Sequence, residues 1–584
     1  AKEIFFAVIS TTITLVAVFF PIVFMDGMTG RLFREFSIVV SGSVIISSFA
    51  ALTFTPMLAT KLLIKREKQS WFYRKTEPFF EGLNNLYSRS LAAFLRKRWI
   101  ALPFTAATIL IIGFLWNHIP AEMAPLEDRS QISINTRGSE GVTYEYIRDY
   151  TEDINQLVDS IAPDAEAVTA RVSSGSGNVR ITLKDMQDRD YTQMEVAEKL
   201  SKAVQKKIMA RSFVQQSSSF GGRRGGMPVQ YVLQATNIEK LQEVLPKFMA
   251  KVYENPVFQM ADVDLKFSKP EARININRDK ASIMGVSTRN IAQTLQYGLS
   301  GQRMGYFYMN GKQYEILGEI NRQQRNKPAD LKGIYIRSDK GDMVQLDNLI
   351  ELTNGIAPPK LYRYNRFVSA TISAGLADGK TIGQGLDEMD KIAKETLDDT
   401  FRTALTGDSK EYRESSSSLM FAFILAILLI YLILAAQFES FKDPLIIMLT
   451  VPLAIAGALV FMYFGGITMN IFSQIGIIML IGLVAKNGIL IVEFANQKQE
   501  TGEDKMQAIK DAALQRLRPI LMTSASTVLG LIPLAFATGE GCNQRIAMGT
   551  AVVGGMLVST LLTMYIVPAI YSYVSTNRSK LKNE

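Results

Sequence analysis

The chain has almost no cysteine and almost no histidine. Its 584 residues include one of each, Cys542 and His118. A single cysteine excludes an intrachain disulfide framework. The single histidine lies where an apolar run ends, so no nucleophile–histidine–acid set is available, and we interpret it as an interfacial side chain. We therefore expect a protein that is not an enzyme and that binds no metal or other cofactor.

Three further signals are missing. No phosphate-binding loop of the P-loop type occurs, so ATP is not the expected energy source. No basic segment with a cleavage site precedes the first apolar run, so Ala1 does not open a signal peptide, and we expect the chain to begin partway through a longer protein. The net charge of +9 comes largely from basic segments that flank apolar runs, which argues against nucleic-acid binding.

Long apolar runs are what the chain has in abundance. A helix needs about 20 apolar residues to cross a hydrocarbon layer about 30 Å thick. We predict eight such spans, at 4–25, 37–58, 99–117, 416–436, 444–464, 471–492, 518–537 and 547–573. The basic segments 61–98, 498–516 and 578–582 then fall on one side, the cytoplasmic one, and the large polar region falls on the other.

These spans divide the chain into units. Residues 1–58 hold two spans, and 59–98 form a cytoplasmic loop with an amphipathic interfacial helix at Phe79–Arg98. A single span at 99–117 leads into the polar region at 118–415. Residues 416–573 hold five spans, and 574–584 form a cytoplasmic tail. The expected fold is an α-helical polytopic membrane domain that carries a large α+β domain outside the membrane.

In the polar region, strand and helix patterns alternate in β-α-β-β-type order, which predicts ferredoxin-like βαβ subdomains. The predicted strands include Gln131–Thr136 and Val263–Lys266. The predicted helices are Thr143–Ser160, Gln193–Met209, Ile238–Glu254 and Ile382–Leu397. Residues 281–332 are predicted to form an inserted module with its own hairpin near Met309–Gly311. Gly221–Gly226 is interpreted as a flexible basic loop.

The two ends of the chain resemble each other. Pro21 and Pro56, which lie in the first two spans, match Pro533 and Pro568 in the last two at a constant offset of 512 residues. Many transporters are built from internal repeats, so we interpret the first pair of spans as the end of an earlier copy. One complete copy then begins near Trp99, and an intact protein would carry about 400 further residues and about twelve spans in all.

A lysine lies in the middle of an apolar span. Lys486 is about 15 Å from the nearer end of 471–492 at helical rise, too far to reach the interface comfortably. A charge at that depth is by default a functional group. Asn487 and Thr523 are predicted to hydrogen-bond around it, although a buried threonine often bonds to its own helix. Arg516 is either a member of this group or an interfacial anchor, and none of the eight spans offers a carboxylate at the same depth.

The motifs around these residues are similar to those of a known family. Gly482-Leu-Val-Ala-Lys486-Asn-Gly-Ile and Arg516-Leu-Arg-Pro-Ile-Leu-Met-Thr523-Ser closely resemble the tenth and eleventh helices of resistance–nodulation–division (RND) multidrug exporters. Phe20-Pro21 and Thr55-Pro56-Met57-Leu58 resemble that family's fifth and sixth helices. The resemblance extends over essentially the whole chain.

The resemblance implies a proton-driven antiporter of the bacterial inner membrane that exports drugs or other small amphiphilic compounds. It implies a homotrimer with periplasmic porter and docking domains, the docking part at about 281–332, that joins a periplasmic adaptor (membrane fusion) protein and an outer-membrane channel. In the family, two acidic residues of the fourth helix exchange protons with the help of a lysine, an arginine and a threonine. Lys486, Arg516 and Thr523 match these last three, with Asn487 beside them, and the acidic pair lies outside this chain.

One segment departs from the family. The drug exporters carry a Gly- and Phe-rich loop in the deep pocket, whereas the matching stretch here, Ser173–Arg180, is shorter and has no phenylalanine. Two alternative functions remain open. The 25 methionines permit a metal-ion-exporting relative, although most are scattered singly through apolar spans. The other alternative is a membrane protein that acts as a periplasmic sensor or assembly factor without transport.

Overall fold

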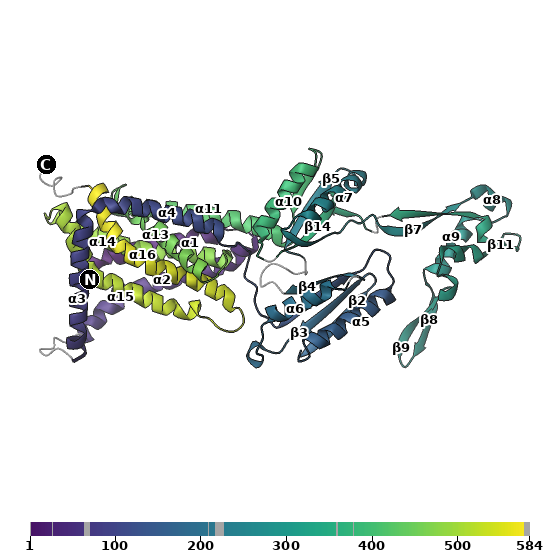
Figure 1. Ribbon diagram of the computed structural model, residues 1–584, viewed down its shortest axis with the longest axis horizontal. Coiled ribbons are helices and arrows are strands. Elements are labelled where there is room, and N and C mark those ends of the chain that lie inside the picture. Colours follow the sequence, from purple (N-terminus) through teal and green to yellow (C-terminus); the bar gives the residue numbers. More distant parts are fainter. Residues whose placement is uncertain are drawn as a thin grey trace.

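The computed structural model of the protein describes residues 2–25, 27–62, 71–207, 209–216, 227–357, 360–377 and 379–576. The molecule is elongated (Figure 1), with a helical bundle at one end, two mixed α/β units beyond it and a narrow module at the far end. The described part of the chain begins and ends at the end of the bundle that is remote from the α/β units. The predicted loop at 221–226 and most of the predicted tail, from 577 on, lie outside the described residues.

Long apolar helices form the bundle. They are α1 (Lys2–Val23), α2 (Gly27–Leu62), α4 (Ala101–His118), α11 (Gly407–Phe438), α12 (Asp443–Met448), α13 (Thr450–Phe464), α14 (Ile471–Glu500), α15 (Lys505–Ala535) and α16 (Cys542–Val574). Within the described residues, seven helical segments are long and apolar enough to cross a membrane, with α12 and α13 counted together. Helix α1 adds a shorter apolar stretch, Val8–Val23, in the place of the first predicted span.

Helix α14 lies at the centre of this bundle. It packs against α1, α11, α13, α15 and α16, and 78% of its most apolar window is buried, against 0% for α2. A helix that is apolar on all sides requires either protein or lipid around it. The surroundings of α14 are therefore protein, which gives the polar residues on it fixed neighbours.

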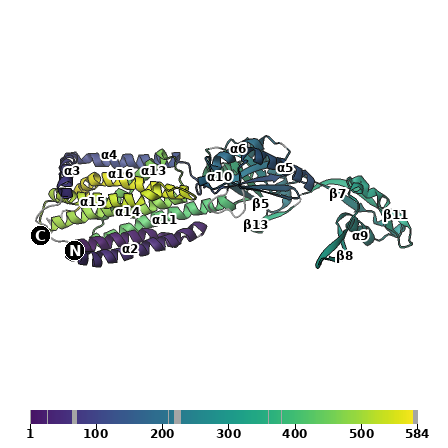
Figure 2. The same ribbon diagram turned by 90° about the horizontal axis from the view of Figure 1, so that it is seen from below.

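Helix α3 (Trp71–Arg96) crosses the remote end of the bundle (Figures 1 and 2). A short 3-10 helix, η1 (Arg98–Ile100), joins it to α4. The apolar face of α3 packs on α16, where the Tyr87 hydroxyl donates a hydrogen bond to the Met564 carbonyl at 2.6 Å. Leu86, on the other side of α3, is exposed. The helix predicted at Phe79–Arg98 thus corresponds to the later part of α3, which begins earlier, at Trp71, and ends two residues sooner, at Arg96.

The first α/β unit follows α4. Its elements are β1 (Gln131–Arg137), α5 (Tyr144–Ile161), β2 (Ala167–Ser173), β3 (Ser176–Thr182), the 3-10 turn η2 (Met186–Asp188), α6 (Gln193–Gln205) and β4 (Arg211–Gln216). The sheet order is β2-β3-β1-β4, all antiparallel. The predicted continuation of α6 to Met209 was wrong, because the chain leaves the helix at Lys206 and turns into β4, an edge strand that the sequence pattern did not reveal.

The second unit repeats the β-α-β-β-α-β order of the first, with one additional short strand, β13. It contains β5 (Val229–Ala235), α7 (Ile238–Glu254), β6 (Phe258–Val263), β13 (Tyr362–Tyr364), β14 (Phe367–Leu376), α10 (Ile382–Thr396) and β15 (Arg402–Leu405), in the sheet order β13-β14-β5-β15 with β6 paired to β14. The strand predicted at Val263–Lys266 was wrong. Strand β6 ends at Val263 because the next residue, Asp264, turns its carboxylate to the backbone N–H of Thr371 at 2.7 Å.

The narrow module is inserted between β6 and β13. Its elements are β7 (Lys269–Ile276), α8 (Arg278–Ile283), α9 (Thr288–Leu299), β8 (Gln302–Met309), β9 (Lys312–Gly318), η3 (Arg322–Gln324), η4 (Pro328–Gly333), β10 (Tyr335–Arg337), β11 (Met343–Gln345), η5 (Leu346–Asn348) and β12 (Ile350–Ala357). Strands β7 and β12 pair along their whole length, and this paired ribbon connects the module to the second unit. The module has its own small core, which includes Ile291 and Leu346, so it extends beyond the predicted range 281–332 on both sides.

Candidate functional site

Lys486 lies near the middle of α14 and is partly buried. Four residues earlier, on the same face, a Cβ atom at Gly482 would lie 3.1 Å from the Val18 side chain of α1. Since residues four apart on a helix share a face, Lys486 belongs to the side of α14 against which α1 packs. The missing side chain at Gly482 is what lets the two helices approach there.

The α1 side of this contact provides hydroxyl groups whose protons are already engaged. The hydroxyls of Thr11 and Thr12 donate to the Val8 carbonyl at 3.0 and 2.8 Å. The Thr14 hydroxyl donates to the Ser10 carbonyl at 2.7 Å. Within the part of the chain that the structure describes, the Lys486 ammonium group forms no ion pair with a carboxylate. Glu493, two turns along α14, instead accepts a hydrogen bond from the Gln497 amide at 3.1 Å.

Asn487 faces away from this contact. Its side chain is buried between α14, α15 and α16, where its amide nitrogen lies 3.3 Å from the Ser524 hydroxyl and 3.4 Å from the Thr560 hydroxyl. The Thr560 and Ser524 hydroxyls are themselves 3.1 Å apart. These three side chains form a closed polar cluster. Ser524 and Thr560 were not predicted, although Ser524 directly follows Thr523 in the sequence motif.

Thr523 does not join that cluster. Its hydroxyl donates to the Ile520 carbonyl one turn back in α15, at 3.1 Å. The sequence left two partners open for Thr523, the group around Lys486 and the backbone of its own helix, and the hydroxyl bonds to its own helix. The structure therefore does not bring Thr523 and Asn487 together, because adjacent residues point in directions about 100° apart on a helix and Ser524 occupies the facing position.

Arg516 lies on α15, nearer than Thr523 to the end of the bundle that α3 crosses. Its guanidinium group stacks over the Phe494 ring at 4.4 Å. Phe494 follows Lys486 by eight residues, so this contact is about 12 Å along the axis of α14 from the lysine. Arg518 is an anchor, with its guanidinium 3.4 Å from the Glu77 carboxylate and 4.5 Å above the Phe80 ring of α3. The four predicted site residues thus lie in four separate environments in this chain.

A second buried polar network lies nearer the α3 end of the bundle and was not predicted. Asn496 donates to the Asp443 carboxylate at 3.1 Å and accepts from the Tyr571 hydroxyl at 2.5 Å, and Gln499 donates to the same hydroxyl at 2.6 Å. All four side chains are buried. Their spacing in the sequence is too wide to reveal the network, since α12, α14 and α16 each contribute to it.

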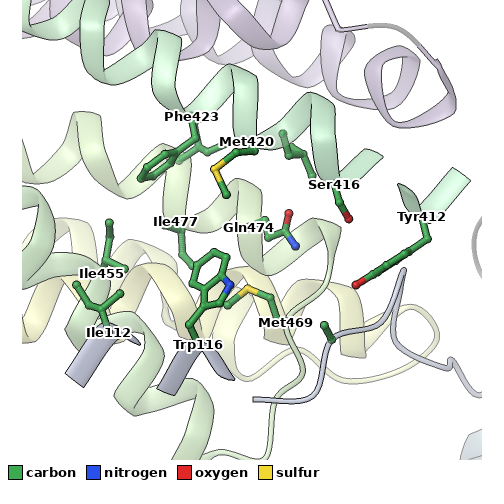
Figure 3. Close-up of a pocket in the computed structure, with 13 residues that line it drawn as sticks. Ile112, Trp116, Tyr412, Ser416, Met420, Phe423, Ile455, Met469, Gln474 and Ile477 are labelled. Atoms are coloured by element: carbon green, nitrogen blue, oxygen red, sulfur yellow. The ribbon is translucent and has the colours of Figure 1, made fainter. Parts of the chain in front are cut away.

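An apolar cavity of about 540 Å³ opens at the other end of the bundle (Figure 3). It lies between α4, α11, α13 and α14. The labelled side chains Trp116, Met420, Phe423 and Ile477 surround it, and Gln474 contributes one of its few polar groups. Such a cavity accepts an apolar chain or ring far better than a charged group.

Just beyond α4, Glu122 is largely buried against the turn between α13 and α14. The Thr468 hydroxyl donates to its carboxylate at 2.5 Å, and the Glu122 backbone N–H donates to Met469. Burial raises the pKa of the Glu122 carboxyl above its ordinary range, and the hydrogen bond from Thr468 opposes only part of that shift.

The stretch that departs from the drug exporters forms a tight hairpin. Ser173 pairs with Ser176 across the turn between β2 and β3, and Gly175 takes a φ of +80°, which favours glycine. The turn projects no aromatic side chain. The departure seen in the sequence therefore corresponds to a short, closed turn rather than to a loop that could line a pocket.

Comparison with known proteins gives two findings. The sequence profile of the AcrB/AcrD/AcrF family matches residues 1–575. An uncharacterized transporter of Haemophilus influenzae is 32% identical over 594 residues, which cover 99% of this chain and 57% of the relative. The chain thus spans little more than half the length of that curated relative. Among the described residues, no group of three or more His, Cys, Asp or Glu side chains could hold a metal ion.

Proposed function

This chain belongs to the AcrB/AcrD/AcrF family of RND permeases, and on that premise we propose that it is part of a proton-driven exporter of drugs or other amphiphilic compounds. It is a multi-pass membrane protein of a transporter family. To this membership of a transporter family we add three proposals: proton antiport as the energy source, amphiphilic compounds as substrates, and the partner proteins named below.

One observation carries the proposal. Lys486 is a charged side chain in the middle of the most enclosed helix of the bundle, and its ammonium group forms no ion pair with a carboxylate of the described residues. Burying such a charge costs several kcal/mol unless an opposite charge or water compensates it. A carboxylate from a helix outside this chain would supply that compensation on the side of α14 where α1 packs.

The proposed mechanism follows from that pairing. While the carboxylate is ionised, Lys486 remains bound to it, and protonation from outside removes the attraction and frees the ammonium group. The lysine then reorients, and α14 shifts with the helices packed around it. The Asn487–Ser524–Thr560 cluster, locked between α14, α15 and α16, transmits this shift because it ties the three helices together.

The proposed setting is the bacterial inner membrane. The α3 end of the bundle, with its basic loops, faces the cytoplasm, and the two α/β units stand in the periplasm as ferredoxin-like porter subdomains. The module between β7 and β12 is the proposed docking element, which would meet a periplasmic adaptor and an outer-membrane channel. A homotrimer is the proposed assembly, as is general in the family.

Amphiphilic compounds are the proposed substrates. The cavity near Trp116 and Phe423 offers an apolar surface next to the periplasmic units, which suits the apolar part of such a molecule. The closed β2–β3 turn offers no aromatic side chain for stacking flat drugs. We therefore favour flexible or rounded amphiphiles over planar aromatic ones.

The test is proton flux in liposomes that contain the complete protein. Addition of a transported amphiphile should release protons across a membrane with an imposed pH gradient. Lys486→Ala should reduce the coupled flux to the level of empty liposomes, and Lys486→Arg should restore part of it because the charge remains. Lys498→Ala is the matched control, since Lys498 is a half-buried lysine near the end of α14 that is paired with Glu503 at 2.8 Å. Undiminished coupled flux in Lys486→Ala would refute the proposal.

A further inference from the structure

A cavity of about 250 Å³ lies between α3 and α15. Helix α3 runs across the end of the bundle while α15 runs along it, so the two helices meet in a corner (Figure 1). Arg518 lines the cavity and is the residue at which the predicted span 518–537 begins. An amphipathic helix along a membrane surface lies at the boundary between headgroups and acyl chains. In the proposed orientation, the cavity therefore lies at the depth of the phospholipid heads of the cytoplasmic leaflet.

The cation of this cavity is fixed in place but has donors to spare. The Arg518 guanidinium stacks on the Phe80 ring and reaches one oxygen of the Glu77 carboxylate from two nitrogens, at 3.4 and 3.5 Å. Both contacts are long for a charged pair, in which the N···O distance is about 2.7–2.9 Å. A guanidinium has five N–H donors, and the Arg518 side chain is 46% exposed. Donors therefore remain for a second anion on the exposed side.

The carboxylates of the cavity outnumber this cation. Glu81 lines it together with Glu77 and lies one helical turn further along α3. Like charges at that spacing destabilise a helix, and a ligand cation would relieve the repulsion. A purely anionic head would be repelled by the surplus negative charge. A head with a phosphate and a primary ammonium group fits better, because Arg518 donates to the phosphate and the ammonium group donates up to three hydrogen bonds to the carboxylates.

Apolar surface continues from the cavity along α15. Met522 and Leu529 follow Arg518 by 4 and 11 residues, which places all three on one face of the helix, and both apolar side chains are exposed. Ser524, which is buried toward α14 and α16, lies on nearly the opposite side of α15. The charged group thus stands at the end of an outward apolar stripe, which is the arrangement of a lipid head above its acyl chains.

Helix α3 borders the cavity with further apolar side chains. Leu83 lines it. Phe79 and Leu86 lie four residues before Leu83 and three after it, so they share its face, and both are exposed. An exposed apolar face of an amphipathic helix lies among acyl chains when the helix is in a membrane interface. These side chains indicate that lipid rather than water borders this side of α3.

We propose that the corner between α3 and α15 binds one phospholipid of the cytoplasmic leaflet whose head carries a primary ammonium group, as in phosphatidylethanolamine. Arg518 holds the phosphate, Glu81 and Glu77 hold the ammonium group, and an acyl chain lies along Met522 and Leu529. The inference goes beyond the proposed export. It rests on the proposed membrane orientation and needs no proton coupling.

Native mass spectrometry of the complete protein in detergent tests the inference, because it resolves the binding of the first lipid molecule. The probes are phosphatidylethanolamine, phosphatidylcholine and phosphatidylglycerol with the same acyl chains. Methylation removes the N–H donors of the choline head, and the glycerol head has no cation. The ethanolamine lipid should therefore bind about three- to tenfold more tightly than either, as expected for partly exposed charged hydrogen bonds.

Two variants assign that preference to the cavity. Glu81→Gln keeps the size of the side chain but removes its charge, and it should reduce the preference for ethanolamine over choline by about threefold. Arg518→Gln should weaken ethanolamine-lipid binding by about threefold or more, because the phosphate loses its cation. Arg89→Gln is the matched control, since it removes the same charge from an exposed position of α3 that does not line the cavity, and it should change neither value.

A purely structural role gives a different result. If Arg518 and Glu77 only join α3 to α15, Arg518→Gln should lower the unfolding temperature, while Glu81→Gln alters neither that temperature nor the lipid preference. That result, or equal first-lipid affinities for the three heads, would overturn the inference. Soluble phosphoethanolamine should compete far more weakly than the lipid, because it has no acyl chains, and competition at the affinity of the lipid would exclude a lipid site.

Failure of this inference can be told apart from failure of the proposed function. Equilibrium lipid binding needs no proton gradient, so Lys486→Ala should keep the preference for the ethanolamine head. A retained preference without any coupled proton flux would leave the lipid site standing and reject proton-driven export. Coupled flux without a headgroup preference would do the reverse.

Discussion

At the scale of single residues, polar side chains that are adjacent in sequence face different helices and so have different partners. Lys486 and Asn487 are adjacent in sequence, yet the lysine lies on the side of α14 next to α1 while the asparagine is locked between α15 and α16. Thr523 and Ser524 divide in the same way, one bonded to its own helix and the other to Asn487 and Thr560. The depth of Lys486 in its span could be predicted from the sequence, whereas the partners of its neighbours could not.

A prediction at this scale concerns Glu122. Since the pKa of this carboxyl is raised in the folded protein, the folded state holds its proton to higher pH than the unfolded state does. Stability should therefore fall as the pH rises from the ordinary carboxyl range through the raised pKa, and this loss should persist above it. Glu122→Gln keeps a hydrogen-bonding group opposite Thr468 and should remove that loss.

The measurement is the unfolding temperature of both proteins in detergent across a pH series. Glu122→Gln should be the more stable of the two at neutral pH, and the difference should vanish in acid, where the glutamate is protonated in both states. Equal pH dependence of the two proteins would show that Glu122 is not responsible.

At the scale of elements, glycine decides how closely the central helices pack. Gly555 of α16 is the sharpest case, since a Cβ atom there would lie 2.1 Å from the Leu480 side chain of α14 and 2.9 Å from the Ala454 carbonyl of α13. The side chain could move, but a backbone carbonyl of α13 cannot move without shifting that helix. In membrane bundles, small residues at helix contacts are what permit such approach.

Gly555→Ala should therefore destabilise the bundle by about 1–3 kcal/mol, as is usual for overpacking. Gly530→Ala is the matched control on α15, because a Cβ atom there meets nothing within 4 Å. Removing a helical glycine without a clash should be neutral or stabilise by up to about 1 kcal/mol. Thermal unfolding of the two variants checks the contrast, and equal effects would contradict the packing argument.

The bounds of some helices and strands could be predicted closely from the sequence, and those of others could not. Strand β1 and helices α5, α7 and α10 follow clear period-2 or amphipathic patterns and lie within a residue or two of the predicted positions. Strand β4 has no such pattern and was missed, since edge strands are defined by their single neighbour rather than by their own residues. Strand β6 was displaced because Asp264 ends it through a contact with β14, more than a hundred residues away in sequence.

At the scale of the whole molecule, the polar region is built from one order of elements used twice, with a separate module inserted into the second copy. The module is attached through the paired strands β7 and β12, whose last pair, Ile276 and Ile350, leads directly into it. Its core residues, such as Ile291 and Leu349, pack with one another and form a cluster distinct from that of the second unit. We therefore expect it to be removable.

Replacement of residues 277–349 by an Asn-Gly turn should leave the rest of the protein folded. The two strands would then close as a hairpin, for which Asn-Gly is a favoured connection. The unfolding temperature of the bundle should stay unchanged. Loss of folding would show that the module supports the units on which it stands.

By itself, the sequence determined the features that depend on neighbouring residues. These include the apolar spans, the amphipathic helix α3, several strands and helices of the α/β units, and the presence of Lys486 deep in a span, because each follows from a local run or period. The tertiary structure alone decided the rest, namely the Asn487–Ser524–Thr560 cluster, the network around Asp443 and the full extent of the inserted module. Each of these joins residues from separate elements, and only packing sets which face of one element meets which face of another.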